Sequence, residues 1–230
     1  MKKLGLVGGI SWISTIDYYR YINEGINEKL GGLNFAECII YSLNFDDFQT
    51  NNTANNWDAT FDLIFHACQS LKNSGAEAIV LCANTAHAVA DRVEQEIQLP
   101  IIHIVTATAR EIDKYGFRRV GLLGTKFTME MEFYKNKLKE EKIEAIIPDT
   151  QEARDFIQQT IKEELGRGIF KEETKQAYIS IINELIEKGA EGIILGCTEI
   201  PMLISQKDFS VPVFDTTRIH SQAAVDFALS

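Results

Sequence analysis

Short apolar runs alternate along the chain with longer stretches in which apolar residues recur at helical spacing. The short runs are typical of buried strands, and the longer stretches are typical of amphipathic helices. The predicted strands are Leu4–Val7, Cys38–Leu43, Ala78–Leu81, Ile101–Ile104, Val120–Leu123, Ala145–Ile147, Gly192–Leu195 and Val213–Phe214. The predicted helices are 14–30, 57–71, Ala86–Ile97, Ala107–Tyr115, Glu130–Glu141, Glu152–Leu165, Thr174–Lys188 and a closing helix from Ile219. This alternation predicts parallel sheets flanked by helices, the α/β class.

Two local signals refine this prediction. Ser14, with Asp17 three residues on, resembles a capping box and predicts the start of the first helix. The asparagine-rich stretch Gln49–Trp57 carries no clear periodicity and predicts a mobile loop.

The two halves of the chain repeat one another. Residues 3–8 match residues 119–124, and residues 75–81 match residues 189–195. Leu99-Pro100 and Val211-Pro212 form a third match at nearly the same offset, each before a short strand. The repeat predicts two similar α/β subdomains, the first formed by residues 1–98 with 211–230 and the second by residues 99–210.

Composition and charge narrow the functional classes. The 230 residues carry a formal net charge of −10 and show no lysine or arginine cluster, which disfavours nucleic acids and anionic membranes as partners. No apolar run approaches the roughly 18 residues that span a bilayer. The glycines after Met1-Lys2-Lys3 argue against a signal peptide. We therefore expect a cytoplasmic protein.

The four cysteines form no C-x-x-C pair, so we expect reduced thiols. Cys82 and Cys197 each follow the end of a repeated strand, where open α/β sheets bind ligands. Each also precedes a predicted helix start, a setting that lowers a thiol pKa. If the two halves face each other, the two thiols would approach one ligand from opposite sides. Cys38 and Cys68 are expected to be small buried hydrophobic residues.

His87 lies close to Cys82 in the sequence and allows two other interpretations. A zinc site formed by both cysteines and His87 would lack a clear fourth ligand and has no recognised spacing. A Cys82–His87 dyad is also conceivable, although packing or orientation is favoured over a role as base. Asn84 is positioned to cap the helix that carries His87.

Four stretches carry a resemblance to a known family. They are residues 8–15, Cys82-Ala83-Asn84-Thr85-Ala86-His87, residues 123–129 and residues 196–201. In this order they resemble the aspartate/glutamate racemase family, in its aspartate racemase-like branch. The resemblance implies two pseudo-symmetric subdomains, an active site in the cleft between them and frequent homodimers. It also implies a small-molecule amino-acid substrate and no cofactor or metal.

The resemblance assigns roles to individual residues. Cys82 and Cys197 match the two catalytic cysteines, which exchange the α-proton of the substrate as thiol and thiolate. Asn84, Thr85 and Thr198 match positions that hold the α-carboxylate and amino group. Further positions that line the same site are matched by Ser11, Thr125 and Glu199. Glu199 stands where glutamate racemases carry histidine and where the aspartate-type branch carries glutamate.

The side-chain ligand of the substrate is the least defined part of this prediction. Aspartate requires a cation for its distal carboxylate, and some aspartate racemases supply an arginine from the loop after the second strand. Here residues 44–50 contain no cation, and Gln49 stands near that place. Lys162 and Arg167 are candidates in the second half. We therefore expect aspartate as substrate, with glutamate or broad specificity as the alternative.

Other classes of function remain open at this point. A single-thiol decarboxylase would need only one of the two cysteines. A two-thiol isomerase of dicarboxylates would need both but would exchange no α-proton. A non-catalytic amino-acid binder would need neither thiol.

Overall fold

The chain folds into two compact α/β units, and a computed structural model describes all 230 residues. Met1–Ile104 with Thr217–Ser230 form the first unit, and Val105–Thr216 form the second. The sequence predicted both boundaries several residues earlier. The observed boundaries lie later in the chain because the strand at 101–102 still pairs with the first sheet, and the strand at 213–215 still pairs with the second. Each half therefore completes its own sheet before the chain crosses to the other unit.

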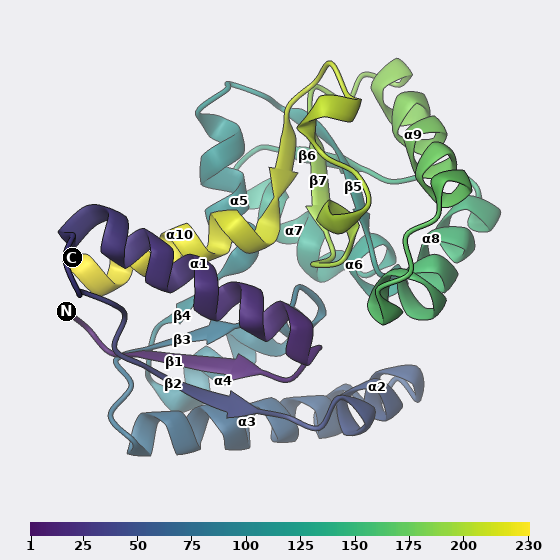
Figure 1. The fold of residues 1–230 in the computed structure, drawn as a ribbon. Coiled ribbons are helices and arrows are strands. Elements are labelled where there is room, and N and C mark those ends of the chain that lie inside the picture. The colour runs from purple at the N-terminus through teal and green to yellow at the C-terminus, as the bar shows by residue number, and fades with distance from the viewer. The chain divides into compact units, whose positions relative to one another are not determined.

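The first unit is built on a parallel four-stranded sheet in the order β2-β1-β3-β4 (Figure 1). Its strands are β1 (Leu4–Gly8), β2 (Cys38–Ser42), β3 (Ala78–Leu81) and β4 (Ile101–Ile102). Its helices are α1 (Trp12–Leu30), α2 (Phe45–Thr53), α3 (Trp57–Asn73), α4 (Ala90–Ile97) and most of α10 (Thr216–Leu229). Val7 of β1 pairs with Leu81 of β3. The two central strands therefore end at the same edge of the sheet.

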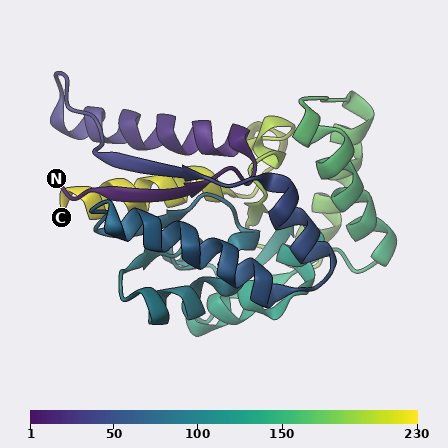
Figure 2. The same ribbon diagram turned by 90° about the horizontal axis from the view of Figure 1, so that it is seen from below.

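Alternate residues of the central strands face opposite sides of this sheet. Leu4, Leu6 and Val80 pack in one buried layer with residues of α1 and α10. Val7 and Leu81 pack in a second buried layer with residues of α3 and α4. Figure 2 shows the sheet between α1 on one side and α3 on the other. Burial on both faces explains why these strands are continuous apolar runs in the sequence.

The second unit repeats this architecture with a parallel sheet in the order β6-β5-β7-β8. Its strands are β5 (Arg119–Gly124), β6 (Glu144–Ile146), β7 (Ile193–Gly196) and β8 (Val213–Asp215). Its helices are α5 (Ile104–Asp113), α6 (Lys126–Glu130), α7 (Glu132–Glu140), α8 (Gln151–Glu163) and α9 (Glu172–Glu187). Leu123 of β5 pairs with Leu195 of β7, as Val7 pairs with Leu81 in the first sheet.

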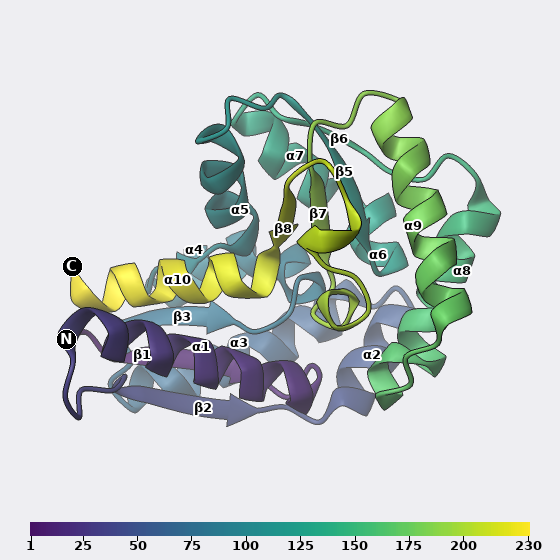
Figure 3. The ribbon, with the colours of Figure 1, turned by 45° about the horizontal axis from the view of Figure 1, so that its top comes forward.

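The core of the second unit lies against α8 and α9. Leu123, Ile193 and Leu195 of the sheet are buried there together with Ile157 of α8 and Ile182 of α9. Figure 3 shows these two helices beside the sheet, with α5 on its other side. The identical strand order of the two sheets confirms the predicted fold of two similar parallel α/β subdomains.

Three local predictions need correction. Residues 45–53 form the helix α2 instead of a loop, because Phe48 and Asn52 bury one face of this segment. Helix α1 begins after Ser11, so Ser14 lies inside the helix and its hydroxyl donates to the Ser11 carbonyl at 2.9 Å. Asn84 has helical backbone angles and makes no capping hydrogen bond through its side chain.

No helix in the structure combines the length and the apolar character needed to cross a membrane.

Candidate active site

The turn from β1 to α1 fixes Ser11 at the carboxyl end of the first sheet. Gly9 has a φ of 85°, and a Cβ atom there would lie 2.2 Å from the carbonyl oxygen of Leu43. The Gly9 N–H donates to Oγ1 of Thr15 at 2.8 Å, and the Thr15 hydroxyl donates to the Ser11 carbonyl at 3.0 Å. Only glycine fits this position, because the conformation is left-handed and the neighbouring backbone fills the space. Ser11 is half-buried directly before the first turn of α1.

Cys82 directly follows β3, the strand beside β1. Its side chain is fully buried in the layer beneath α1 and α10. The Sγ atom lies 3.7 Å from the carbonyl oxygen of Val80. Ser14 of α1 reaches the backbone of Cys82, since its Oγ lies 3.4 Å from the Cys82 carbonyl oxygen. The first unit therefore holds this thiol close to the start of α1.

Asn84 and Thr85 follow Cys82 in the same segment. Both side chains are buried, with relative exposures of 4% and 7%. Thr85 opens a short 3-10 turn over Thr85–Val89 that leads into α4. The segment thus presents an amide and a hydroxyl at the same edge of the sheet as Cys82. These groups are chemically suited to bind a carboxylate or an amino group.

His87 is a structural residue in this segment. Its Nδ1 lies 3.0 Å from the carbonyl oxygen of Ala83, and its Nε2 accepts the N–H of Ile104 at 3.2 Å. These bonds fix the neutral tautomer with hydrogen on Nδ1. Burial lowers the pKa of His87 to about 4. Because backbone groups engage both ring nitrogens, the structure favours the packing interpretation over a base or a zinc ligand.

Cys197 follows β7, which lies beside β5 in the second sheet. Its thiol donates to Oε2 of Glu199 at 2.9 Å, and the Thr198 hydroxyl donates to the same oxygen at 2.8 Å. Cys197 and Glu199 are buried, with relative exposures of 7% and 9%. A buried carboxylate in contact with a thiol can receive its proton, so this pair can produce a thiolate without a change in total charge.

Both thiols have raised pKa values, contrary to the prediction from helix starts. Burial raises the pKa of Cys82. Burial also raises the pKa of Cys197, and the charge of Glu199 and its hydrogen bond to the thiol raise it further. Backbone hydrogen bonds from Thr198 and Glu199 act in the opposite direction. The segments after both cysteines are short 3-10 turns, so the field of a longer helix does not offset desolvation.

The two cysteines do not occupy identical positions of the repeat. The pairing of Val7 with Leu81 and of Leu123 with Leu195 aligns Cys82 with Gly196. Relative to its strand, Cys197 therefore lies one residue closer to the C-terminus than Cys82 does. A shift of one residue moves a side chain to the other face of a sheet. Accordingly Cys82 packs with α1 and α10, whereas Cys197 packs with α8 and α9.

Thr125 directly follows β5 and caps α6. Its Oγ1 accepts the N–H of Thr128 at 3.2 Å. Because Gly124 pairs with Gly196, Thr125 and Cys197 leave the sheet at neighbouring positions of the same edge. The second unit therefore brings together Thr125, Cys197, Thr198 and Glu199.

Lys126 is a cation at this edge that the sequence analysis did not single out. Its backbone N–H donates to Gln158 of α8 at 2.7 Å, and its Nζ lies 3.2 Å from Oδ1 of Asp155. Both side chains of this ion pair are substantially exposed, at 43% and 55%. The signal was present in the sequence, since Lys126 stands three residues beyond the predicted strand Val120–Leu123 of the repeat. It was missed because the cation was expected elsewhere.

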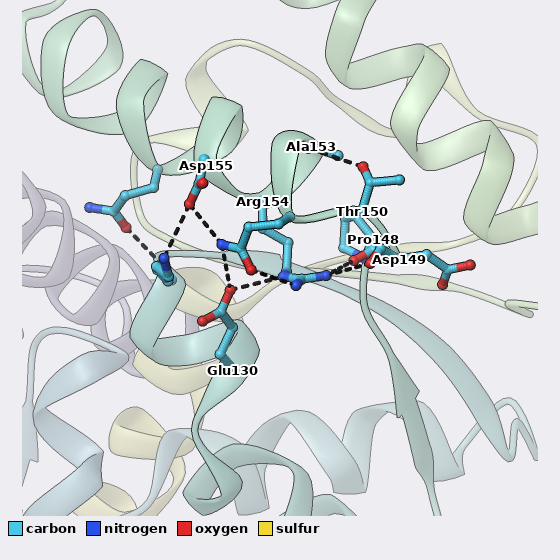
Figure 4. Close-up of polar contacts among 10 residues, drawn as sticks. Glu130, Pro148, Asp149, Thr150, Ala153, Arg154 and Asp155 are labelled. Atoms are coloured by element: carbon cyan, nitrogen blue, oxygen red, sulfur yellow. Dashed lines mark hydrogen bonds and ion pairs between the residues drawn. The ribbon is translucent and has the colours of Figure 1, made fainter.

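Arg154 lies in the same part of the second unit but is fully engaged (Figure 4). Its guanidinium donates to Glu130 at 2.8 Å and to the carbonyl oxygens of Pro148 and Asp149, each at 2.7 Å. A further bond reaches Gln151 at 2.7 Å. These contacts fasten the segment before α8 to α6, so Arg154 serves the structure of this unit.

The other expected side-chain ligands are dispersed. Gln49 is half-buried in α2, which begins shortly after β2 ends. Lys162 is exposed near the end of α8, and Arg167 is exposed in the 3-10 turn that follows. Cys68 is buried on α3, as predicted, whereas Cys38 in β2 is only partly buried, contrary to the prediction.

Comparisons with known proteins agree with one another. The sequence pattern of the Asp/Glu/hydantoin racemase family matches residues 7–224. The chain is 24% identical to the broad specificity amino-acid racemase RacX of Bacillus subtilis, over 99% of this chain and 98% of RacX. A crystal structure of a proposed Asp/Glu racemase from Yersinia pestis is 47% identical, covers 100% of both chains and superposes with a TM-score of 0.94. An aspartate racemase homologue from Pyrococcus horikoshii OT3 is 39% identical over 100% of both chains, with a TM-score of 0.87.

Proposed function

The chain belongs to the Asp/Glu/hydantoin racemase family, and we propose that Cys82 and Cys197 invert the α-carbon of a free amino acid without a cofactor. As a member of this family, with racemases among its relatives, it is an isomerase of the amino-acid racemase class. One observation carries the proposed mechanism. Each of the two similar units places one buried cysteine directly after the same interior strand of its sheet.

The chemistry of inversion calls for two such groups. One thiolate removes the α-proton, so that its S–H bond forms as the C–H bond breaks. The opposite thiol then donates its proton to the other face of the planar carbanion, which restores a C–H bond. After one turnover the thiol and the thiolate have exchanged places. The reverse reaction starts from this second state, so each cysteine acts as base for one enantiomer.

Glu199 supplies a route to the thiolate of Cys197. Transfer of the thiol proton to Oε2 of Glu199, 2.9 Å away, leaves a thiolate beside a neutral carboxylic acid. The backbone hydrogen bonds from Thr198 and Glu199 then stabilise the sulfur anion. This geometry supports Glu199 as a proton acceptor for the thiol instead of the substrate-binding role expected from the sequence.

Polar groups beside the thiols would bind the substrate's α-carboxylate. Negative charge develops on this carboxylate as the α-proton leaves, so hydrogen-bond donors aimed at it lower the barrier. Asn84 and Thr85 in the first unit and Thr125 and Thr198 in the second have suitable donors. Ser11 stands at the equivalent end of β1. The expected loss for removal of one such donor is about a hundredfold to a thousandfold in kcat.

We propose an acidic amino acid, aspartate first, as the substrate, with Lys126 as the ligand of the distal carboxylate. Lys126 and Cys197 leave neighbouring strands at the same edge, and both contact regions of α8. Its ion pair with Asp155 is exposed and so contributes little energy, roughly 0–1 kcal/mol. A substrate carboxylate can therefore replace Asp155. Gln49 remains a proposed neutral ligand, and broad specificity, the property named for RacX, is the alternative.

A proton-exchange assay tests this function. Purified protein without cofactor is incubated in deuterated buffer with L-aspartate, L-glutamate, neutral and basic amino acids and a substituted hydantoin. Loss of the α-proton is followed by NMR, and the D-enantiomer is identified by chiral chromatography. Inversion that requires both Cys82 and Cys197, and survives Cys38→Ala, would support the proposal.

Other results would point to other functions. Exchange that depends on one cysteine alone would favour a single-thiol enzyme. Turnover of a dicarboxylate without α-proton exchange would favour the two-thiol isomerase. Amino-acid binding without any exchange would favour a non-catalytic binder.

A further inference from the structure

Three histidines and one tyrosine form a cluster inside the first unit, next to the segment that carries Cys82. We call this cluster the histidine stack, and its residues are Tyr18, His87, His103 and His220. The ring centroid of His87 lies 4.7 Å from that of His103 and 5.4 Å from that of His220. Tyr18, His87 and His220 are buried, and Tyr18 shares a buried layer with Cys82. The stack therefore lies where it can brace the candidate active site from within.

His220 forms a rigid wall on one side of His87. The Tyr18 hydroxyl donates to Nδ1 of His220 at 2.8 Å, and Nε2 of His220 donates to the carbonyl oxygen of Ile102 at 2.5 Å. Burial lowers the pKa of His220 to about 3, so its ring is neutral and holds its hydrogen on Nε2. These bonds connect α1, α10 and β4 around the His87 ring.

His87 itself joins two backbone groups at places where regular structure begins or ends. Residues 82–84 belong to neither strand nor helix, since they lie between β3 and the 3-10 turn. The N–H of Ile104 opens α5, where the first N–H groups have no partner within the helix. His87 donates from Nδ1 to the Ala83 carbonyl at 3.0 Å and accepts from Ile104 at Nε2, at 3.2 Å. A neutral imidazole suits both contacts, because it donates at one nitrogen and accepts at the other.

The bond to Ala83 controls the direction of the backbone beside Cys82. The Ala83 carbonyl belongs to the peptide that joins Ala83 to Asn84. This peptide is planar, and its C=O and N–H point in opposite directions. Because the oxygen is held toward His87, the N–H of Asn84 points away from the histidine stack. A rotation of this peptide would turn Asn84 and, through Ala83, displace Cys82.

We propose that His87 is a positioning residue, whose bond to the Ala83 carbonyl holds Cys82 and Asn84 in the geometry that proton transfer requires. This inference rests on the proposed racemase function, since it takes Cys82 as the group that exchanges the α-proton. His87 transfers no proton itself, because backbone groups engage both of its ring nitrogens. A residue that served packing alone would affect stability and leave the kcat of the folded protein unchanged.

Two amide variants separate positioning from packing. His87→Asn places an amide nitrogen near the position of Nδ1 and keeps the donor to Ala83, whereas His87→Gln can accept from Ile104 but loses that donor. Both should lower the midpoint of thermal unfolding. At a temperature where all variants are folded, His87→Gln should lower kcat by about tenfold to a hundredfold, because a small displacement of a reacting group is costly. His87→Asn should keep most of the wild-type kcat.

A matched control removes one methylene group from the same unit, away from the histidine stack. Ile26 is fully buried near the end of α1. Ile26→Val should lower the unfolding midpoint and keep the wild-type kcat. Equal kcat values in the wild type and His87→Gln, or equal losses in His87→Asn and His87→Gln, would overturn the inference.

Alkylation of the thiols provides a second readout that needs no enzymatic activity. The folded variants are treated with iodoacetamide, and the rates at Cys82 and Cys197 are compared by peptide mass spectrometry. His87→Gln should raise the rate at Cys82 severalfold relative to Cys197, whereas His87→Asn and Ile26→Val should keep the wild-type ratio. An unchanged ratio in His87→Gln would overturn the inference. A wild type that racemises no amino acid would instead refute the proposed function, and the alkylation ratio would still decide whether His87 positions Cys82.

Discussion

The thiol of Cys197 lies 2.9 Å from Oε2 of Glu199, and both side chains are buried. This contact joins the candidate acid/base thiol of the second unit to a proton acceptor two residues along the chain. The carboxylate has two opposing effects. Its charge raises the pKa of the Cys197 thiol, yet its oxygen provides the site to which the thiol proton can move.

Glu199→Gln separates these effects. Removal of the charge is expected to lower the pKa of Cys197, so thiolate should form at lower pH than in the wild type. Racemisation should nevertheless fall by roughly a hundredfold or more, because the amide cannot receive the proton. The pH dependence of alkylation of Cys197 measures the first effect, and initial rates measure the second. Glu187→Gln, at the exposed end of α9, should change neither. An unchanged racemisation rate in Glu199→Gln would contradict this role.

The buried histidines of the first unit are expected to make it sensitive to acid. Burial lowers the pKa of His87 to about 4 and that of His220 to about 3. An unfolded histidine has a pKa of about 6.5, so the unfolded chain binds more protons between these values. Stability should therefore fall as pH decreases below about 6.5, by roughly 1.4 kcal/mol per pH unit for each histidine.

Urea unfolding over this pH range measures the effect. His220→Gln should flatten the acid limb of the curve, although lost contacts with Tyr18 and Ile102 should reduce stability at neutral pH. His66→Gln is the control, because His66 is exposed on α3. An acid limb as steep in His220→Gln as in the wild type would show that this histidine is not responsible.

Lys126 is expected to determine the preference for acidic side chains. Lys126→Gln should raise KM for aspartate by about tenfold to a hundredfold, the loss expected for one charge-assisted hydrogen bond. Racemisation of neutral amino acids should change little. Asp155→Asn should lower KM for aspartate, because it releases the ammonium group of Lys126 from its ion pair. Lys162→Gln tests a cation that was expected from the sequence. A larger rise in KM for aspartate in this variant than in Lys126→Gln would show that Lys162 binds the distal carboxylate.

Replacement of Gly9 by any other residue is expected to reduce the stability of the fold, because the local backbone leaves no room for a side chain. Gly9→Ala combines a φ of 85° with a Cβ atom only 2.2 Å from the Leu43 carbonyl oxygen. Gly31 is a matched control, since its φ is 68° but no atom lies within 4 Å of an added Cβ. Gly31→Ala should cost about 1–2 kcal/mol from the backbone alone. Gly9→Ala should cost clearly more in thermal or urea unfolding, and equal costs would contradict the steric argument.

The periodicity and the internal repeat sufficed to predict the fold. Burial on both faces of each sheet produces continuous apolar runs that are easy to recognise in a sequence. Because these runs recur in both halves of the chain, they predict two similar sheets. Helix α2 was missed because its polar residues Asp46, Asp47 and Asn52 conceal one buried face centred on Phe48. Only packing against α3 reveals that face, and a single sequence does not contain it.

The electrostatics of the site were less predictable than its residues. The sequence placed Cys82 and Cys197 at strand ends, and the structure has them there. The sequence did not predict that both thiols are buried. Burial raises the pKa values of Cys82 and Cys197, which is the opposite of the expected direction. The contact between Cys197 and Glu199 also depends on the turn after β7, whose geometry local sequence signals did not predict.

The isotope pattern of the first turnovers tests the two-thiol mechanism most directly. The substrate identified in the exchange assay is supplied as its pure L-enantiomer in deuterated buffer, and both enantiomers are separated and analysed at early times. The mechanism predicts deuterium in the D-product while the remaining L-substrate keeps its proton, and Cys82→Ala and Cys197→Ala should each stop inversion. Deuterium that enters both enantiomers equally from the start, or inversion at the wild-type rate without either cysteine, would contradict it.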